Sequence, residues 1–364
     1  MTMRVGDLVE VRSKEEILAT LDTSGKLDGL PFMPQMFKYC GQRFPIFKVA
    51  HKTCDTVSGP AGLWAPRCIH LNIRCDGEGY GGCDAACLIF WKEAWLRPVQ
   101  GETVPEAANG ALTLSNSAGC TEQDVIGATR TTDQSGEPIY RCQAVCLPQY
   151  TLKLPWWDFR QYVKDYTSGN LSIRELCAGA LYVAYWHATQ AYRHRFGTGA
   201  PGRWLYDRFQ SIRGGVPFPY RLGLIPIGQK TPRLDLNLQP GELVRVKSHQ
   251  EILATLDARN FNNGMAFDVE MVPYCGKKLR VKARVNVFID EKTGRRKSLK
   301  TPAVILEDAW CRACFSPHRM GCPRGIYSWW REIWLERVPE DSLSQPAAPV
   351  VPTHGAESKG VRIS

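Results

Sequence analysis

Short stretches of alternating apolar and polar residues stand near both ends of the chain. They read LVEV at residues 8–11 and LVRV at residues 243–246, and such alternation is typical of a half-buried strand. Each stretch is followed by a serine with a glutamate three positions later, namely Ser13 with Glu16 and Ser248 with Glu251. This spacing predicts a capped helix over the run EILATL. Both ends are therefore expected to begin with a strand and a short helix.

Both ends then continue with the same order of signals. The segments FPIFKV (44–49) and LRVKARVNVFI (279–289) are rich in β-branched and aromatic residues and predict strands. Tryptophan-rich segments follow, FWKEAWL at 90–96 and WWREIWL at 329–335. A small, strongly bent β-barrel or half-open sheet fits this order. The opening strand resembles the first strand of KOW-type nucleic-acid-binding barrels, and the resemblance implies a nucleic-acid partner.

The middle of the chain has a different pattern. Residues 101–138 are rich in Gly, Thr, Ser, Asn and Glu and predict an extended connection. Two helices are expected after it. Pro155 and Gly169 mark the start and the end of the first, and a capping box of Ser172 and Glu175 opens a long amphipathic helix that runs towards Arg195. The central region is therefore predicted to be mainly helical.

The two ends are also related residue by residue. Twelve of seventeen positions are identical between GDLVEVRSKEEILATLD (6–22) and GELVRVKSHQEILATLD (241–257), at a constant offset of 235. The tryptophan-rich segments correspond at an offset of 239, so the second copy carries four extra residues. A unit of about 95 residues is too long for a solenoid repeat and is typical of a duplicated domain.

These patterns predict an α+β fold in which two homologous, barrel-like β-rich end domains carry cysteine-ligated metal sites and flank a mainly helical central domain. The expected divisions are 1–100 for the first copy, 101–150 for a linker, 151–235 for the helical domain, 236–339 for the second copy and 340–364 for a tail. The tail is rich in proline and alanine without apolar periodicity and is expected to be disordered.

Composition narrows the class of protein. The N-terminus has no secretory signal, and the longest apolar run, CAGALYVAYW at 177–186, is about half of what a bilayer span requires. We therefore expect a cytoplasmic protein without a membrane partner. In a reducing compartment, fourteen cysteines favour metal binding or thiol chemistry over disulfides. The net charge of +10 favours acidic or phosphate-bearing partners.

The cysteines follow the repeat. Three positions hold a cysteine in both copies: Cys40 with Cys275, Cys75 with Cys314, and Cys83 with Cys322. The fourth differs, because Cys87 aligns with Ile326 while the second copy has Cys311 instead. Core packing does not explain why the second copy lacks one cysteine and has another nearby. A metal ion or cluster does explain it, because it requires four ligands and each copy then has four. The predicted ligand sets are Cys40, Cys75, Cys83, Cys87 and Cys275, Cys311, Cys314, Cys322.

The spacing of the predicted ligands does not decide between an iron–sulfur cluster and zinc. Structural zinc usually pairs cysteines two to four residues apart, and one such pair occurs in each copy. The other ligands are scattered, which suits a cluster held between loops. Two 4Fe–4S clusters are slightly favoured, with zinc as the alternative. A third site could use Cys54, Cys120, Cys142 and Cys146. Cys54 is also a rival for the fourth place in the first copy, and a candidate reactive thiol beside His51.

Arginines alternate with aromatic residues between positions 193 and 215. They predict a weak anion-binding groove of Arg193, Arg195, Arg203, Arg208 and Arg213, with a solvated helix end and glycine-rich loop as the alternative. Three functions stay open. The first is a cytoplasmic metalloprotein with two cysteine-ligated clusters that acts in electron transfer or a biosynthetic redox step. The others are a zinc-stabilised tandem module that binds nucleic acid or a protein, and an enzyme with a pocket between the end domains and the central helices.

Overall fold

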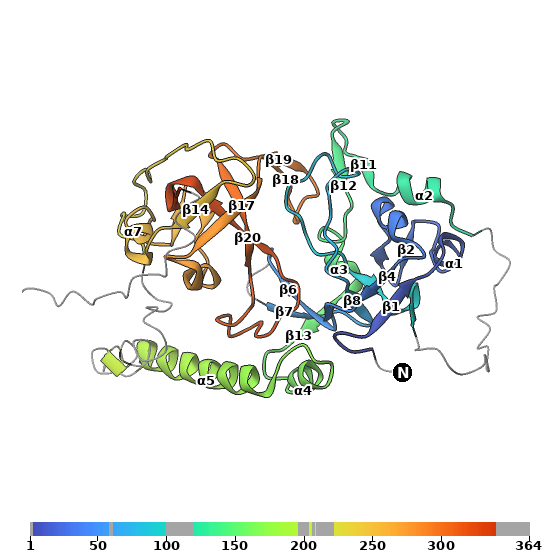
Figure 1. The fold of residues 1–364 in the computed structure, drawn as a ribbon, viewed down its shortest axis with the longest axis horizontal. Coiled ribbons are helices and arrows are strands. Elements are labelled where there is room, and N and C mark those ends of the chain that lie inside the picture. Colours follow the sequence, from blue (N-terminus) through green and yellow to red (C-terminus); the bar gives the residue numbers. More distant parts are fainter. Residues whose placement is uncertain are drawn as a thin grey trace, which may run out of the picture.

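The computed structural model describes residues 3–57, 61–99, 119–195, 204–205, 208 and 222–339, without the side chains of residues 185 and 188–195. Two β-rich lobes lie side by side, and a pair of helices runs along one edge of both (Figure 1). We call residues 3–99 and 119–154 the N-terminal lobe and residues 236–339 the C-terminal lobe. No helix in the described part of the chain is long and apolar enough to cross a bilayer.

Short strands build the N-terminal lobe. Its strands are β1 (Leu8–Val11), β2 (Lys26–Leu27), β3 (Leu30–Pro31), β4 (Arg43–Pro45), β5 (Lys48–Val49), β6 (Lys52–Asp55), β7 (Ala61–Trp64), β8 (Cys68–His70), β9 (Trp91–Lys92), β10 (Leu96–Pro98), β11 (Arg130–Thr132), β12 (Pro138–Tyr140) and β13 (Leu152–Leu154). Its helices are α1 (Lys14–Leu18), η1 (Pro34–Tyr39), η2 (Glu93–Trp95), α2 (Glu122–Gly127) and α3 (Leu147–Tyr150). The strands form three-stranded sheets in the orders β10-β1-β4, β5-β8-β9 and β13-β7-β6, and further two-stranded pairs.

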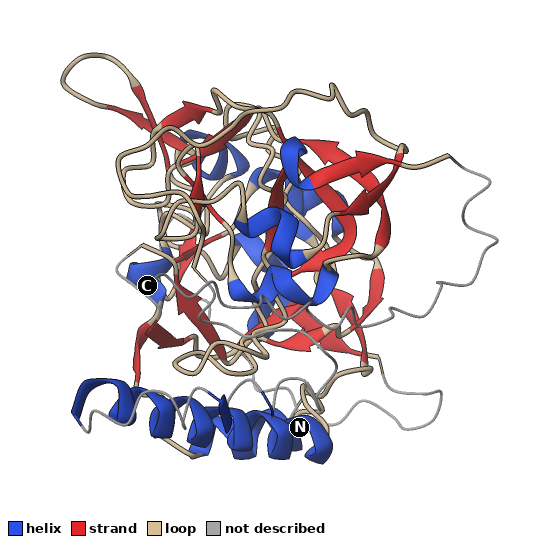
Figure 2. Ribbon diagram, turned by 90° about the vertical axis from the view of Figure 1, so that its left-hand side faces the viewer, coloured by secondary structure: helices blue, strands red, loops and turns tan. Residues whose placement is uncertain are grey.

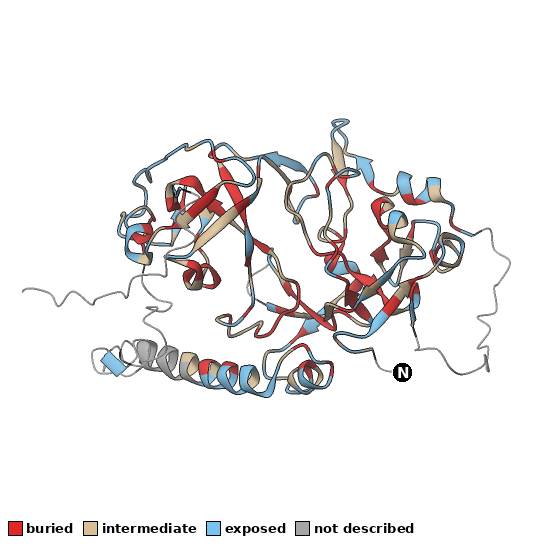
Figure 3. Ribbon diagram, viewed as in Figure 1, coloured by how far each residue is buried: buried red, intermediate tan, exposed pale blue. Residues whose placement is uncertain are grey.

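The C-terminal lobe is organised around one larger sheet of order β21-β20-β17-β14-β22. Its strands are β14 (Leu243–Val246), β15 (Phe261–Asn262), β16 (Met265–Ala266), β17 (Lys278–Arg284), β18 (Val287–Ile289), β19 (Arg296–Ser298), β20 (Ala303–Trp310), β21 (Tyr327–Arg331) and β22 (Leu335–Arg337). Its helices are α7 (His249–Leu253), η3 (Val269–Tyr274) and η4 (Glu332–Trp334). The buried residues follow the inner faces of the strands in both lobes (Figure 3).

The opening units of the two lobes share their contacts. In both, the predicted capping box is present at the first helix, with Ser13 and Glu16 in one and Ser248 and Glu251 in the other. In both, a buried tryptophan donates its indole N–H to a threonine at 3.0 Å: Trp95 to Thr20 and Trp334 to Thr255. β1 pairs with β4 and β10 as β14 pairs with β17 and β22. Beyond these units the sheets differ, and a duplication of the whole domain is not shown.

The predicted fold class is wrong in its central part. Only α4 (Arg160–Thr167) and α5 (Ile173–Arg195) extend beyond two turns there, and the rest of the described central chain consists of short strands and short helices. Those strands do not form a separate domain, because β13 completes the sheet of β6 and β7. The prediction therefore overstated the helix content, because the predicted helical domain of residues 151–235 begins with the three-residue strand β13.

The two lobes are interleaved rather than joined end to end. The β18–β19 hairpin of the C-terminal lobe crosses to β12, where Tyr140 donates its backbone N–H to Gly294 at 2.8 Å. Ile289 from that hairpin belongs to the N-terminal core. In the other direction, Lys52 on β6 donates to the backbone carbonyl of Met320 at 2.7 Å.

The helix pair is tied to the lobes by one buried charge network. The ammonium of Lys52 lies 2.5 Å from the Asp165 carboxylate on α4, and both side chains are buried. His51 lies 3.3 Å from the same carboxylate. In the view of Figure 2, α5 runs along one edge of the molecule beneath the strands. The network fixes α4, β6 and the Met320 loop together and so positions the segments that carry the cysteines.

Candidate metal centre

The segment RCDGEGYGGC is a closed loop. Arg74 and Leu88 form a β-bridge at its base, and the backbone N–H of Cys75 donates to Cys87 at 2.8 Å. Inside the loop, Tyr80 and Gly82 both donate backbone N–H groups to the carbonyl of Gly77, at 2.9 and 3.1 Å. The loop brings Cys75, Cys83 and Cys87 together on one short stretch of chain.

Glycine is required at position 77. Its φ of +75° lies in the left-handed region, and a Cβ there would stand 2.2 Å from the carbonyl oxygen of Cys83. Gly82 also has a positive φ, of +71°, but a Cβ there would have no atom within 4 Å. The two glycines thus differ in kind: Gly77 permits a close approach of backbone to Cys83, whereas Gly82 only permits the turn.

The C-terminal lobe holds this loop in place. Asp84 accepts backbone N–H groups from Asn286 and Val287 at 2.8 and 2.9 Å, just before and at the start of β18. The guanidinium of Arg74 donates to Gly325 at 3.0 Å and lies 3.8 Å above the ring of Tyr327. Residues at both ends of the cysteine loop therefore contact the C-terminal lobe.

A fourth cysteine reaches the loop from the central chain. Cys142 follows β12, and its neighbour Gln143 is buried and fully hydrogen-bonded. The Gln143 carbonyl oxygen accepts from Phe90 N at 2.8 Å, and its amide donates to Phe90 O at 2.9 Å and Pro31 O at 3.1 Å. Gln143 thus fixes the Cys142 segment against the start of β9.

These four cysteines surround one internal cavity of about 40 Å³, which we call the cysteine cavity. Its wall includes Cys75, Cys83, Cys87 and Cys142 together with Arg324 and Ile326 of the C-terminal lobe. The space exceeds the roughly 10–15 Å³ that one water needs. Segments of both lobes therefore line a space that is larger than one water molecule needs, and four cysteines belong to its wall.

Burial keeps these thiols protonated. It raises the pKa of Cys75 to about 11 and that of Cys142 to about 12, and it also raises the pKa values of Cys83 and Cys87. Repulsion between neighbouring sulfurs in their charged form also raises these pKa values: Cys83 raises the pKa of Cys75, and Cys75 raises that of Cys142. A positive charge inside the cavity would reverse the balance, because coordination to a cation favours the thiolate.

Two polar side chains face this group of sulfurs. The amide of Gln35 donates to the Cys75 sulfur at 3.0 Å, and Gln35 is itself buried. The buried guanidinium of Arg324 borders the cavity and is neutralised by Glu291 at 2.7 Å. A hydrogen bond to a ligand sulfur is one of the means by which proteins adjust the reduction potential of an iron–sulfur cluster. The four thiols and the amide at Cys75 are the donor types of a thiolate-bound cluster, although among the described residues these thiols are not placed to hold a single metal ion.

The third cysteine shared by the two copies lies elsewhere. Cys40 and Cys275 are the C-cap residues of η1 and η3, with nearly identical backbone angles. Each is partly buried against the core of its own lobe. The charged neighbours of Cys40 are Glu15 and Lys14, and it does not line the cysteine cavity. Cys142, and not Cys40, lines the cavity together with Cys75, Cys83 and Cys87.

The second predicted ligand set is divided. Cys311 and Cys322 lie together with Cys54 of β6, in a buried group that also includes Ala313. Cys314 is exposed, and Cys275 is in the C-terminal core. The predicted third set is divided as well, because Cys142 lines the cysteine cavity while Cys120 and Cys146 are packed in the N-terminal core. Within the described residues, no group of three or more His, Cys, Asp or Glu is placed to hold a single metal ion.

His51, the neighbour of the candidate reactive thiol Cys54, contacts other groups. The ring of His51 contacts the backbone carbonyls of Val49 and Gln161 and the Asp165 carboxylate. Burial lowers its pKa to about 3, so it is neutral at physiological pH. The residues that act on Cys54 are Cys322, Arg324 and Arg319. The candidate anion groove falls largely on residues outside the description: of its five arginines, only the side chain of Arg208 is described.

A separate cleft of about 300 Å³ lies between α5 and the loop that follows β20. Its wall includes Glu175, Gly179, Glu270, Tyr274, Cys314 and Phe315. Burial raises the pKa of Glu270, whose carboxylate accepts backbone N–H groups from Cys314 at 3.1 Å and Phe315 at 2.5 Å. The Glu270 carboxylate, which borders the cleft, therefore also fixes the loop. No protein-family model matches the chain, and no curated protein matches it either.

Proposed function

We propose that this chain is an iron–sulfur protein whose cysteine cavity holds one cluster through Cys75, Cys83, Cys87 and Cys142, and that it acts in electron transfer. The observation that carries the proposal is that four cysteines, from two chain segments, line one cavity. Core packing alone would not require Gln35 to direct an amide at the Cys75 sulfur.

The proposed role follows from the number and placement of the thiols. Four cysteines complete the protein ligands of a 2Fe–2S or 4Fe–4S cluster, and such a cluster supplies a one-electron redox couple when bound. The wall of the cavity is mostly apolar, with Phe90, Leu88 and Ile289 beside the sulfurs. These residues exclude water, and the Gln35 amide stabilises negative charge on Cys75. No disulfide joins the fourteen cysteines in the structure, and the proposal places the protein in a reducing compartment such as the cytoplasm.

Structural zinc is the second candidate. Cys83 and Cys87 are separated by three residues, which is within the spacing of zinc-binding cysteine pairs. In that case the four cysteines would stabilise the lobe interface and carry no redox couple. Both candidates share the ligands and differ in the content of the cavity.

Element analysis and visible absorption of anaerobically purified protein separate these outcomes. The proposal expects brown protein with broad visible absorption and about equal amounts of iron and acid-labile sulfide, up to about four of each per chain. One equivalent of zinc in colourless protein would replace the iron–sulfur proposal by the zinc candidate. Protein without stoichiometric metal, purified from cells supplied with iron and zinc, would overturn both.

A further inference from the structure

A second group of thiols lies outside the cysteine cavity. Cys54 is on β6 of the N-terminal lobe, and Cys311 and Cys322 belong to the segment between β20 and β21 of the C-terminal lobe. Cys54 and Cys322 are 2% and 7% exposed, and Ala313 packs beside them. The group therefore joins the two lobes at a point where no solvent separates them.

Cys54 and Cys322 are the most deeply buried thiols of this group. Their side chains pack in the same buried cluster although they are 268 positions apart in the chain. The backbone at Cys54 is fixed by the guanidinium of Arg324, which donates to its carbonyl at 2.9 Å. Two thiols from different lobes thus pack together in one buried cluster.

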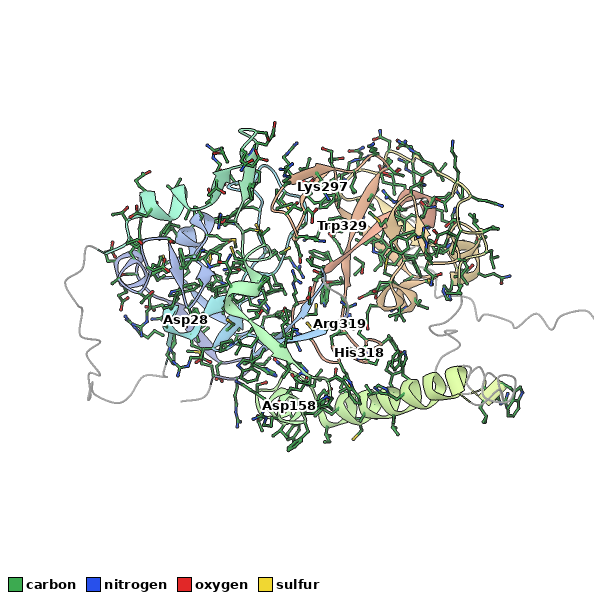
Figure 4. All side chains as sticks on the ribbon, turned by 180° about the vertical axis from the view of Figure 1, so that it is seen from behind. Asp28, Asp158, Lys297, His318, Arg319 and Trp329 are labelled. Carbon is green, nitrogen blue, oxygen red and sulfur yellow. The ribbon has the colours of Figure 1, made fainter. Side chains whose placement is uncertain are left out.

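The charges around the pair are asymmetric. The hydrogen bond from Cys322, supported by the charges of Arg324 and Arg319, lowers the pKa of Cys54 to about 6 against the effect of burial. The same contact raises the pKa of Cys322, and burial raises that of Cys311. Figure 4 places Arg319 in the middle of the molecule, above the helix pair. One thiolate beside one thiol is the arrangement that thiol–disulfide chemistry uses.

We propose that Cys54 and Cys322 form a redox-active pair that a small hydroperoxide oxidises reversibly to a disulfide linking the two lobes. The Cys54 thiolate attacks the peroxide oxygen, the O–O bond breaks, and a sulfenic acid forms as water leaves. The Cys322 sulfur then attacks Cys54, the S–S bond forms, and a second water leaves. Two thiols lose two electrons and two protons, and one hydrogen peroxide becomes two waters. A dithiol reductant reverses the step.

The oxidised state would connect β6 directly to the segment before β21. Because both sulfurs are buried, we expect the pair to select an oxidant of about the size of water rather than a bulky disulfide. The inference does not depend on the content of the cysteine cavity, since none of its four cysteines takes part.

Peptide mapping tests the pair without any substitution. Trypsin places the three thiols in separate peptides, 53–67 for Cys54, 301–312 for Cys311 and 320–324 for Cys322. Purified protein is treated with one equivalent of hydrogen peroxide, the remaining thiols are blocked with iodoacetamide, and the digest is analysed by mass spectrometry. We expect 53–67 linked to 320–324 as the main disulfide, and its loss after dithiothreitol.

Two variants and a second oxidant test which cysteine is oxidised first and which oxidant the pair prefers. Cys322→Ser should leave Cys54 as a sulfenic acid that dimedone traps, whereas Cys177→Ser, at an exposed cysteine on α5, should form the linked peptide as the unmodified chain does. Oxidised glutathione at the same concentration should form it more slowly. A main disulfide that involves Cys311, or two free thiols at Cys54 and Cys322 after peroxide treatment, would overturn the proposal.

Discussion

Replacing Gly77 by Ala should damage the cysteine loop more than the same change at two neighbouring glycines. A Cβ at Gly77 would stand 2.2 Å from the Cys83 carbonyl oxygen and 2.7 Å from its nitrogen, so the backbone of a proposed ligand must move. The left-handed backbone adds about 1–2 kcal/mol for any residue with a Cβ, and forcing an atom into packed structure adds roughly 1–3 kcal/mol. Together, Gly77→Ala should cost about 2–5 kcal/mol and reduce metal content.

The loop provides its own matched controls. Gly82→Ala meets the same backbone penalty at a φ of +71° but no atom within 4 Å, so it should cost about 1–2 kcal/mol and retain metal. Gly79→Ala has an ordinary φ and open space, and should change stability by less than about 0.5 kcal/mol. Urea unfolding and metal analysis of all three variants measure the series. Equal effects at positions 77 and 82 would refute the close-approach explanation.

Three further predictions concern the surroundings of the site. Asp165→Asn should destabilise the protein by about 3–5 kcal/mol, because it leaves the buried Lys52 ammonium without its counter-ion; Asp158→Asn, at the exposed pair with Arg160, should have little effect on thermal unfolding. Gln143→Leu should cost at least about 1–3 kcal/mol and loosen the Cys142 segment, since the buried Phe90 N–H loses its acceptor; a variant with unchanged urea midpoint would contradict this. Burial lowers the pKa of His70 to about 4 and that of His51 to about 3, so both are neutral in the folded state and protonate near pH 6.5 only when unfolded. The free energy of unfolding therefore does not depend on these histidines above pH 6.5, and each of them lowers it by about 1.4 kcal/mol per pH unit as the pH falls from 6.5 towards 4. The pKa of Asp165 is raised to about 6, so its protonation in the folded state offsets the effect of one histidine between pH 6 and 4. His70→Gln should therefore remove about one proton from the number taken up on unfolding between pH 6.5 and 4, as measured from the pH dependence of urea unfolding. An unchanged pH dependence would contradict a neutral His70 in the folded state.

Local signals in the sequence predicted the ends of the chain well. A serine with a glutamate three residues later requires only neighbouring atoms to form a capping box, and the boxes at Ser13, Ser172 and Ser248 are all present. The strand segments at 44–49 and 279–289 are present too, each divided in two by a break. The central region was harder, because β13 is stabilised by its pairing with β7 rather than by its own three residues.

The proposed ligand set depends on contacts between segments that are far apart in the chain, and counting within a repeat does not contain such contacts. Cys142 lies 55 positions after Cys87 and has no counterpart in the repeat, yet Gln143 directs it into the cysteine cavity. Cys40 matches Cys275 in sequence and in backbone angles, and that match reflects the end of a 3₁₀ helix in each lobe. The adjacent Gln143, a polar residue in an otherwise buried segment, was the one local sign that this segment is fixed in the core.

Metal analysis of Cys142→Ser beside Cys40→Ser tests the central claim most directly. Both variants are prepared anaerobically with the unmodified chain, and iron, acid-labile sulfide, zinc and visible absorption are measured per chain. If Cys75, Cys83, Cys87 and Cys142 hold the metal, Cys142→Ser should lose most of it and Cys40→Ser should keep the level of the unmodified chain. Retention in Cys142→Ser with loss in Cys40→Ser would contradict the assignment of the cysteine cavity as the metal centre.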